Sequence, residues 1–335
     1  MFNLATSLPI AICCVGLIVS PVRSPKQCHP ADSYASEKRV VIKELMSIGK
    51  EDGDSNYLFA KPTNVVVDGK GNIYVIEMFQ KIVRKYDKAG KYLATIGRDG
   101  GGPGEYKMPS VAAVDTKDNL YLFDYTAMRV SAFRPDGSFE RSFVPGFLTG
   151  GISVTSNGEF ILCGVKDGKI IHLVDKSGKL ISSFGDPWQS SADPRMSGFN
   201  FAFTYAGPDG SIYCCPVINP NEVMKCDIGA GTVVRISRDG PGYTPLSFGP
   251  QGPSVSMTRG LVVFPNGTIA VSVSFARDGK PVEQIDFYSK EGLYLVSSSQ
   301  IKGTPRCVDK NGAMYVVTAE PFPRVVKYSV RFEGS

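Results

Sequence analysis

The sequence predicts an all-β fold: a six-bladed β-propeller of four-stranded antiparallel blades, closed by an N-terminal strand that completes the last blade. Three observations carry this prediction. A unit of two hairpins recurs along the 335 residues, turn-forming residues are dense (36 glycines and 23 prolines), and one unpaired strand is left over at each end of the repeats. Four short strands per repeat of about 50 residues are typical of propeller blades.

The first hairpin of each unit consists of two apolar strands joined by a turn rich in Asp, Asn and Gly. The best-preserved copy is PSVAAVDTKDNLYLFD, and PTNVVVDGKGNIYVIE follows the same order. Asn and Gly tolerate the positive φ angles that tight hairpin turns need. Six such hairpins are predicted, at 62–77, 109–124, 152–164, 204–216, 261–273 and 306–318.

A second hairpin follows the first in five of the six units. After the sixth unit the chain continues as one strand, RVVKYSVRF at 324–332, so this unit lacks its fourth strand. The strand KRVVIKELMSI at 38–48 has no partner near it in the sequence. Pairing these two strands removes two exposed sheet edges, which would otherwise invite aggregation. We therefore expect a single propeller over 38–335, with second hairpins at 83–97, 131–143, 172–185, 234–249 and 286–298.

The stretch GGGPGEYKMPSVAAVDTKDNLYLFDYTAMRV at 100–130 resembles an NHL repeat, and the chain is similar to exported six-bladed bacterial propellers that share this repeat. The resemblance implies the fold, but NHL-type propellers are functionally diverse. Lyases of this type use a histidine-bound metal, and the chain lacks the necessary histidines. Lactonase-type six-bladed propellers use a central calcium ion held by acids and Asn.

The N-terminal residues 1–24 are interpreted as a signal peptide, followed by a linker at 25–37. The apolar run LPIAICCVGLIV at 8–19 suits the hydrophobic part of a signal peptide and is short for a membrane span. Ser20 and Ser24 are candidate cleavage positions. No Lys or Arg precedes the run, so a buried or tethering segment is the alternative. The expected location is outside the cytoplasm: periplasmic, cell-surface or secreted.

The net charge argues against two classes of partner, and the cysteine content argues against a zinc ribbon. The net charge of +5 is mild, and Lys and Arg are scattered, so we expect no nucleic-acid binding and no membrane contact beyond the N-terminal segment. The eight cysteines include no C-x-x-C pair, which disfavours a zinc ribbon. In an exported chain Cys214 or Cys215 could pair with Cys226; buried free thiols are the alternative.

Acids end the second strand in three units, and each is followed by a basic residue. The pairs are Glu77 with Lys81, Asp124 with Arg129, and Glu320 with Arg324. One interpretation is an acidic rim at the funnel mouth that binds a cation or a polar ligand. The other is a repeated ion pair between neighbouring strands. As candidate ligand-binding residues we take Glu77, Asp124, Arg129, Trp188, Glu320 and Arg324.

Two stretches interrupt the repeat, and insertions on one face of a repeat array often bind ligands. One is 186–203, which contains the single tryptophan, Trp188; the other is 217–231. The alternative for both is a loop that packs on its own blade.

Several motifs suggest chemistry but have a simpler explanation. The Asp-led turns at Asp68, Asp115 and Asp309 resemble calcium loops, but a calcium loop needs more oxygen ligands at regular spacing, so Asx turns that order a hairpin are the favoured explanation. His172 would have to serve any Ser-His-Asp triad, and no G-x-S-x-G motif supports one. The glycine run 100–104 is not followed by a helix or G-K-[ST], so a blade connection is expected rather than a phosphate loop.

The sequence thus favours a non-catalytic, exported propeller that binds a protein, peptide or carbohydrate on one face, without a resident cofactor. The alternative is a calcium-dependent hydrolase or lactonase of the six-bladed type. RNA binding is disfavoured because the charge is evenly scattered and because the chain has a candidate signal peptide.

Overall fold

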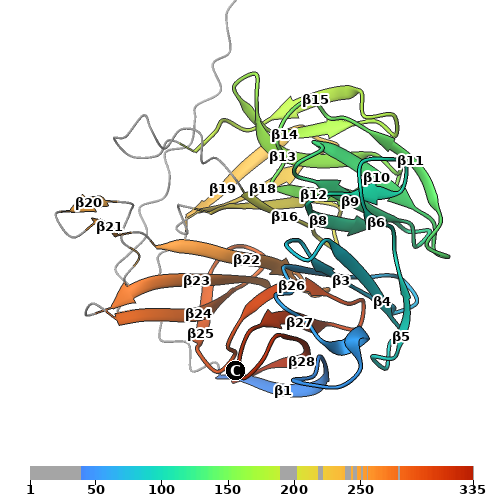
Figure 1. Ribbon diagram of the computed structural model, residues 1–335. Helices are drawn as coiled ribbons and strands as arrows, with labels where there is room; N and C mark the ends of the chain where they lie inside the picture. Colours follow the sequence, from blue (N-terminus) through green and yellow to red (C-terminus); the bar gives the residue numbers. More distant parts are fainter. Residues whose placement is uncertain are drawn as a thin grey trace, which may run out of the picture. The chain divides into compact units, whose positions relative to one another are not determined.

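The computed structural model describes residues 39–188, 202–217, 222–237, 243, 247–249, 252–254, 256–277 and 280–334. These residues form an all-β, six-bladed propeller of four-stranded antiparallel sheets, as predicted (Figure 1). One short 3₁₀ turn, η2 (Ser55–Tyr57), precedes the first blade. No helix in the described part of the chain is long and apolar enough to cross a membrane.

Each blade is a meander in which consecutive strands pair. The first three blades are β2 (Asn64–Val67), β3 (Ile73–Glu77), β4 (Ile82–Tyr86) and β5 (Tyr92–Thr95); β8 (Pro109–Val114), β9 (Leu120–Asp124), β10 (Arg129–Phe133) and β11 (Phe139–Phe143); and β12 (Gly151–Val154), β13 (Phe160–Lys166), β14 (Lys169–Val174) and β15 (Leu180–Phe184).

The last three blades follow the same order. They are β16 (Ala202–Ala206), β17 (Ile212–Pro216), β18 (Glu222–Asp227) and β19 (Thr232–Ser237); β22 (Met257–Val263), β23 (Ile269–Arg277), β24 (Lys280–Tyr288) and β25 (Tyr294–Ser298); and β26 (Thr304–Val308), β27 (Ala313–Thr318), β28 (Arg324–Glu333) and β1 (Arg39–Ile48). Two small ladders lie outside the blades: β6 (Arg98–Asp99) with β7 (Glu105–Tyr106), and β20 (Ser247–Gly249) with β21 (Gly252–Ser254).

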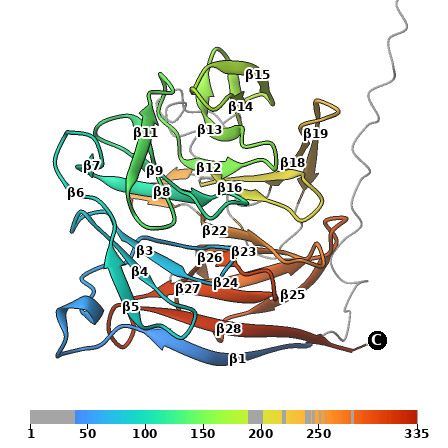
Figure 2. The same ribbon diagram turned by 90° about the vertical axis from the view of Figure 1, so that its right-hand side faces the viewer.

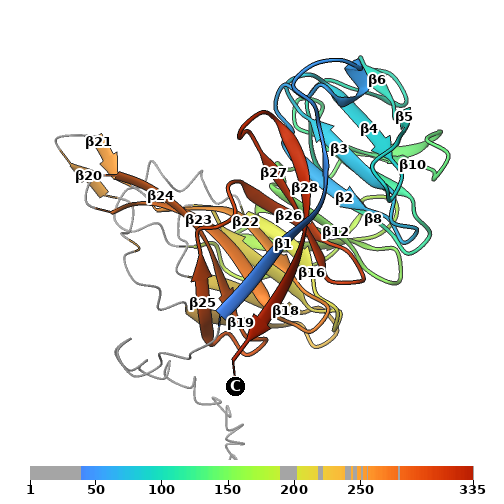
Figure 3. The ribbon, with the colours of Figure 1, turned by 90° about the horizontal axis from the view of Figure 1, so that it is seen from below.

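The first strands of the six blades form a closed ring. β2 contacts β8, β8 contacts β12, β12 contacts β16, β16 contacts β22, β22 contacts β26, and β26 contacts β2 again. Figure 3 shows these strands next to one another at the centre of the blades. The channel of the propeller is therefore lined by first strands, as the sequence predicted.

β1 completes the sixth blade by pairing with β28. The ladder is antiparallel and runs from Arg39 opposite Glu333 to Ile48 opposite Val325 (Figure 2). The predicted closure of the ring by an N-terminal strand is confirmed. Since β1 covers β28, the last blade has four strands like the other five.

The core is divided into six clusters, one at each interface between neighbouring blades. The cluster between blades 1 and 2, for example, joins Tyr74 and Ile76 to Leu120 and Phe133, all buried. Ile48 of β1 joins the cluster that links blade 6 to blade 1. Alternating apolar residues on both faces of each blade supply these clusters, which explains why the strands are apolar on both sides.

Blade 4 corrects one sequence prediction. The second hairpin was expected at 234–249, with 217–231 as an insertion. The structure instead forms this hairpin from β18 and β19, which join at the turn between Asp227 and Thr232. The sequence R-D-G-P-G at 238–242 resembles a hairpin turn, which is why the sequence places the hairpin too late. The observed turn has the sequence D-I-G-A-G and lies at 227–231.

Of the two alternatives for the cysteines, the structure has buried thiols. Cys163, Cys214, Cys226 and Cys307 are buried and form no disulfide, and the buried Cys215 Sγ lies 3.4 Å from the Thr258 hydroxyl oxygen. In the β17–β18 ladder Cys226 lies opposite Ile212, and Cys214 lies opposite Met224. The register therefore separates the two sulfur atoms by two positions, and the cysteines pack as small apolar residues.

The Asp-led turns are Asx turns. Asp115 Oδ1 accepts hydrogen bonds from the backbone N–H groups of Lys117 and Asn119, both at 2.9 Å. Asp68 and Asp309 accept from the backbone in the same way. Because backbone donors occupy these carboxylates, they order the hairpins, as the simpler interpretation proposed.

Candidate functional site

A cavity of about 510 Å³ runs along the first strands of all six blades. We call it the axial cavity. Most of its wall residues are small or β-branched. They include Val66, Val111, Ala112, Ile152, Val154 and Val308.

A second cavity of about 380 Å³ lies at the end where the first strands begin. We call it the mouth. It shares Lys61, Thr63, Phe203 and Arg306 with the axial cavity, so the two are continuous. Starts of β22 and β26 and the end of β27 form the rest of its wall, and they contribute the polar residues Thr258, Arg259, Thr304 and Thr318.

The charged residues among the described walls of both cavities are Lys61, Arg259 and Arg306, and none of these wall residues is an acid. Of the two interpretations of the strand-end acids, the acidic rim therefore has no support among the described residues. The mouth presents positive charge and hydroxyl groups, which suit a ligand that carries negative charge.

Arg306 is the central residue of the mouth. It occupies a β-bulge in β26, between Pro305 and Cys307, and bulges commonly re-aim a side chain next to a functional site. Its Nη1 donates to the carbonyl oxygen of Arg259 at 3.3 Å, and its guanidinium lies 5.5 Å from the centre of the Phe203 ring. Burial and the neighbouring charge of Arg259 lower the pKa of Arg306 to about 10.

The buried Nε of Arg306 has no hydrogen-bond partner within the described residues. The hydroxyl of Thr204, in the wall of the axial cavity, is likewise buried and without a partner there. Buried polar groups are rarely left unpaired. Of the five buried side-chain atoms without a partner in the described part of the chain, two belong to residues that line the axial cavity.

Arg259 also lies at a β-bulge, between Thr258 and Gly260 of β22. Its Nη2 is 3.9 Å from a carboxylate oxygen of Glu283, and both side chains are about half exposed. Gly260 lets β22 approach β26, since a Cβ there would lie 2.4 Å from the Pro305 carbonyl oxygen. The glycine and the two bulges together bring the two arginines to the same mouth.

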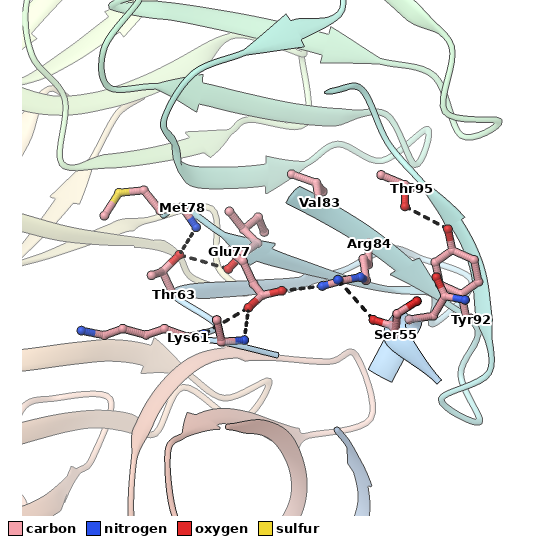
Figure 4. A network of polar contacts seen from close by, with 12 residues as sticks. Ser55, Lys61, Thr63, Glu77, Met78, Val83, Arg84, Tyr92 and Thr95 are labelled. Atoms are coloured by element: carbon pink, nitrogen blue, oxygen red, sulfur yellow. Dashed lines mark hydrogen bonds and ion pairs between the residues drawn. The ribbon is translucent and has the colours of Figure 1, made fainter. Parts of the chain in front are cut away.

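Glu77 lies outside these cavities and is fully buried, with 1% exposure. Its carboxylate forms an ion pair with Arg84 and accepts from the backbone N–H groups of Ala60 and Lys61 at 2.7 and 3.1 Å (Figure 4). Figure 4 also shows the Lys61 side chain extending away from this pair.

The predicted partner of Glu77, Lys81, pairs instead with Asp99 at 2.9 Å. Lys81 has a φ of 54° and lies in the turn, whereas Glu77 faces Ile82 in the ladder. Arg84 is two residues beyond Ile82, so it lies on the same face of the sheet as Glu77.

Asp124 repeats the role of Glu77 one blade later. Its carboxylate accepts four backbone hydrogen bonds, from Lys107, Met108, Thr126 and Ala127, at 2.5 to 3.2 Å. In both blades the acid that ends the second strand accepts hydrogen bonds from two backbone N–H groups. They belong to the two residues that precede the proline at the start of the first strand of the same blade. Each acid thus holds the connection that leads into the first strand of its blade. Neither acid forms the ion pair that the sequence predicted, Glu77 with Lys81 or Asp124 with Arg129.

Replacing Asp124 by asparagine is expected to lower the free energy of unfolding by about 1.5–3 kcal/mol. One amide oxygen would keep part of the network, but the amide N–H₂ would face a backbone donor. Urea unfolding measures the change. Asp136→Asn, in an exposed turn, is the control and should change stability by less than about 0.5 kcal/mol. Equal effects of the two variants would contradict the assigned role.

The other candidate residues lie in three different places. Arg129 donates to the carbonyl oxygens of Gly101, Gly102 and Glu105 and so holds the glycine-rich connection. Glu320 is exposed beyond the end of β27. Arg324 lies 3.9 Å from Glu44 of β1 rather than beside Glu320. None of the three is among the described residues that line the two cavities.

Trp188 is 4% exposed and packs in the core cluster between blades 3 and 4. The guanidinium of Arg235 lies 6.0 Å from its ring. Trp188 therefore anchors the start of the 186–203 stretch. Most of that stretch, 189–201, lies outside the described residues, so its predicted role in binding stays a prediction.

His172 is fully buried and does not line either cavity. Its Nε2 donates to the Gly164 carbonyl oxygen at 2.9 Å, which leaves Nδ1 to accept from the Ser183 hydroxyl at 2.9 Å. Burial lowers the pKa of His172 below its ordinary value. The histidine is satisfied within blade 3, as the non-catalytic interpretation proposed.

This lowered pKa predicts acid sensitivity. Unfolded His172 takes up a proton near pH 6.5, whereas the folded form resists it, so stability falls as pH decreases below about 6.5. The slope from this residue is at most about 1.4 kcal/mol per pH unit. Urea unfolding between pH 7.5 and 5.5 should show the fall, and His172→Gln should flatten it. An unchanged slope in the variant would refute the assignment.

A sequence signal for Arg306, though not for Arg259, is present in the repeat alignment. The residue after the proline at the start of the first strand is Thr63 in blade 1 and Ser110 in blade 2. The same position is Arg306 in blade 6. A change from a small polar residue to arginine at one repeat position is a signal of a site that acids and histidines alone do not reveal.

Among the described residues, no group of three or more His, Cys, Asp or Glu side chains is arranged to hold a metal ion. The described walls of the axial cavity offer hydroxyl, amide and guanidinium groups. Calcium prefers carboxylate and carbonyl oxygens, so these side chains do not fit the central calcium ion of the lactonase type.

Comparisons with known proteins agree with the fold. A family described as a 6-bladed beta-propeller matches residues 53–143. No curated protein is significantly similar in sequence to this chain. The resemblance to NHL repeats in particular stays a prediction.

Several solved structures share the architecture at low identity. A candidate exported protein from Bacteroides fragilis aligns with a TM-score of 0.62 at 12% identity, covering 90% of this chain and 97% of that one. A member of the DUF4221 family from Bacteroides vulgatus gives 0.56 at 8%, covering 88% and 99%. Virginiamycin B lyase from Staphylococcus aureus gives 0.51 at 12%, covering 87% and 99%. These similarities show the propeller fold alone.

Proposed function

We propose that this protein is an exported, non-catalytic propeller that binds a protein, peptide or carbohydrate ligand at the mouth of the axial channel. The observation that carries the proposal is the set of basic residues at the mouth, with a buried arginine Nε that has no partner among the described residues. The proposal of export is supported by the candidate signal peptide and by the fold shared with a candidate exported protein.

The competing function is catalysis. A virginiamycin B lyase becomes inactive when one histidine is replaced by alanine. The histidines of this chain are His29, outside the described residues, and His172, buried in blade 3. Calcium-dependent hydrolysis would need acids at the axis, and the acids proposed for that role bind backbone N–H groups instead. Binding is therefore the better-supported function.

We propose no role in nucleic-acid binding. The three basic residues gather around a cavity, whereas nucleic-acid backbones are bound along extended basic grooves or stripes.

The test is a steric block of the mouth. The full chain is first used to select ligands from a random peptide library and a glycan array. Lys61→Trp then places a bulky side chain at the exposed edge of the mouth while keeping the backbone N–H that Glu77 binds. Selected ligands should bind about tenfold more weakly or worse. Lys91→Trp, on an exposed outer turn, is the control.

Equal affinity for both variants would place the ligand elsewhere and overturn the proposal. Calcium-dependent turnover of lactone or aryl ester substrates by the purified protein would overturn its non-catalytic part.

A further inference from the structure

The wall of the mouth carries more cationic hydrogen-bonding capacity than the described residues use. A guanidinium has five N–H donors. Arg306 donates from Nη1 to the Arg259 carbonyl oxygen at 3.3 Å, and its buried Nε has no partner in this part of the chain. No carboxylate within the described residues forms an ion pair with it, and a partly buried cation without an anion is costly.

Arg259 does not relieve this imbalance. Its own acid, Glu283, is 3.9 Å away, and both side chains are about half exposed, so the pair is weak. The two arginines approach each other because β22 and β26 are in close contact at Gly260. Together with Lys61, the mouth has three cations and one nearby acid, Glu283, so it carries an excess of positive charge.

Apolar residues predominate in the wall of the axial cavity next to the arginines, and Asn64, Ser110, Ser153 and Thr204 add polar groups. From Arg306 the axial cavity continues along Val308, Leu261, Val66, Val111 and Ile152. A small hydrated anion such as phosphate would occupy the mouth and leave this volume unfilled. A ligand with an apolar group next to its anionic group would fill both parts, because pockets are typically apolar with a few polar groups that fix orientation.

We propose that the mouth is a carboxylate receptor, in which Arg306 and Arg259 bind a ligand carboxylate while the adjoining apolar group enters the axial cavity. This inference rests on the proposed binding function. A guanidinium binds a carboxylate in a planar, two-pronged arrangement, and the N–H groups of Arg306 and Arg259 can supply its donors. Peptides that end in an apolar residue share this chemistry with fatty acids, and the experiment separates the two sources.

The experiment is calorimetry on the full chain with four probes. They are a hexapeptide that ends in Val-Leu with a free carboxylate, the same peptide as C-terminal amide, decanoate, and inorganic phosphate. We expect the free-acid peptide or decanoate to bind, and the one that binds identifies the source. The amide should bind about tenfold more weakly or worse than the acid, because it lacks the charge that both arginines need.

Arg306→Gln should weaken binding of the acid by about tenfold or more, and Arg306→Lys should restore only part of it. Arg331→Gln, an exposed arginine on β28 with the same change in net charge, is the matched control and should leave affinity unchanged. Circular dichroism verifies that each variant is folded. If Arg306→Gln does not fold, Arg259→Gln and the comparison of acid with amide still decide the question.

Three results would overturn the inference: equal affinity for acid and amide, phosphate binding as tightly as the apolar carboxylates, or no binding of either carboxylate up to about 10 mM. If acid and amide bind equally while Lys61→Trp still blocks selected ligands, the mouth binds something else. The proposed function then stands and the carboxylate assignment fails. If Lys61→Trp has no effect either, both fail.

Discussion

Replacing Glu77 by alanine is expected to lower the free energy of unfolding by about 3–5 kcal/mol. The substitution leaves the Arg84 guanidinium buried without its anion, and it leaves the N–H groups of Ala60 and Lys61 without their acceptor. Arg84 would retain a weak bond to the Ser55 carbonyl oxygen, at 3.4 Å. Urea unfolding followed by tryptophan fluorescence measures the loss, since Trp188 is buried between blades 3 and 4.

A double-mutant cycle separates the ion pair from the backbone contacts. Arg84→Met alone should also destabilise, because it leaves the buried carboxylate unpaired. The double variant should cost clearly less than the sum of the single variants, because neither charge is then left alone.

The control for this cycle is Lys81→Ala, which breaks the exposed pair of Lys81 with Asp99. It should cost no more than about 1 kcal/mol. If Glu77→Ala costs no more than this control, or if the two single effects simply add, Glu77 and Arg84 do not act as a buried pair.

The fold could be predicted from the sequence because its signals are local and repeated. Each hairpin is recognised from a turn between two apolar strands. Blade 6 lacks a fourth strand at its own place in the sequence, and the unpaired strand at 38–48 supplies it. Blade 4 was the exception. There the third strand, EVMKCD at 222–227, mixes polar with apolar residues, and two glycine-rich turns compete for the hairpin.

The site could be predicted only in part, because ion pairs depend on register and not on sequence distance. Glu77 and Lys81 are four residues apart, but the turn between them directs Lys81 toward Asp99. Asp124 and Arg129 even lie opposite each other in the ladder. The Asp124 carboxylate nevertheless binds four backbone N–H groups, while Arg129 reaches carbonyl oxygens of the glycine-rich connection.

The mouth arginines escaped prediction for a different reason. Arg259 and Arg306 belong to first strands that are 47 positions apart in the sequence, and β-bulges set their direction. The repeat alignment marks Arg306 as unusual, but a bulge has no reliable sequence signature, so the direction of the two side chains is visible only in the folded ring. The site therefore depends on blade 6, because Arg306 lies in this blade and β1 supplies its fourth strand.

Deleting β1 is expected to abolish the folded monomer. The deletion removes the partner of β28 along its ladder and removes Ile48, 2% exposed, from the core cluster between blades 6 and 1. β28 would then be an unprotected edge strand, which pairs with other chains. A chain that starts at Gly49 should aggregate in size-exclusion chromatography with light scattering, whereas a chain that starts at Arg39 should remain monodisperse and unfold cooperatively.

A circular permutant separates the position of β1 in the sequence from its position in the blade. Arg39 lies opposite Glu333, so a short turn can join the end of β28 to the start of β1 as a hairpin. A chain that starts at Gly49 and carries residues 39–48 after this turn should recover the monomer and its cooperative unfolding. Recovery would show that blade 6 needs the strand itself and not an N-terminal connection. A stable, monomeric deletion variant would show instead that three strands suffice, and β1 would then have no role in closing the ring.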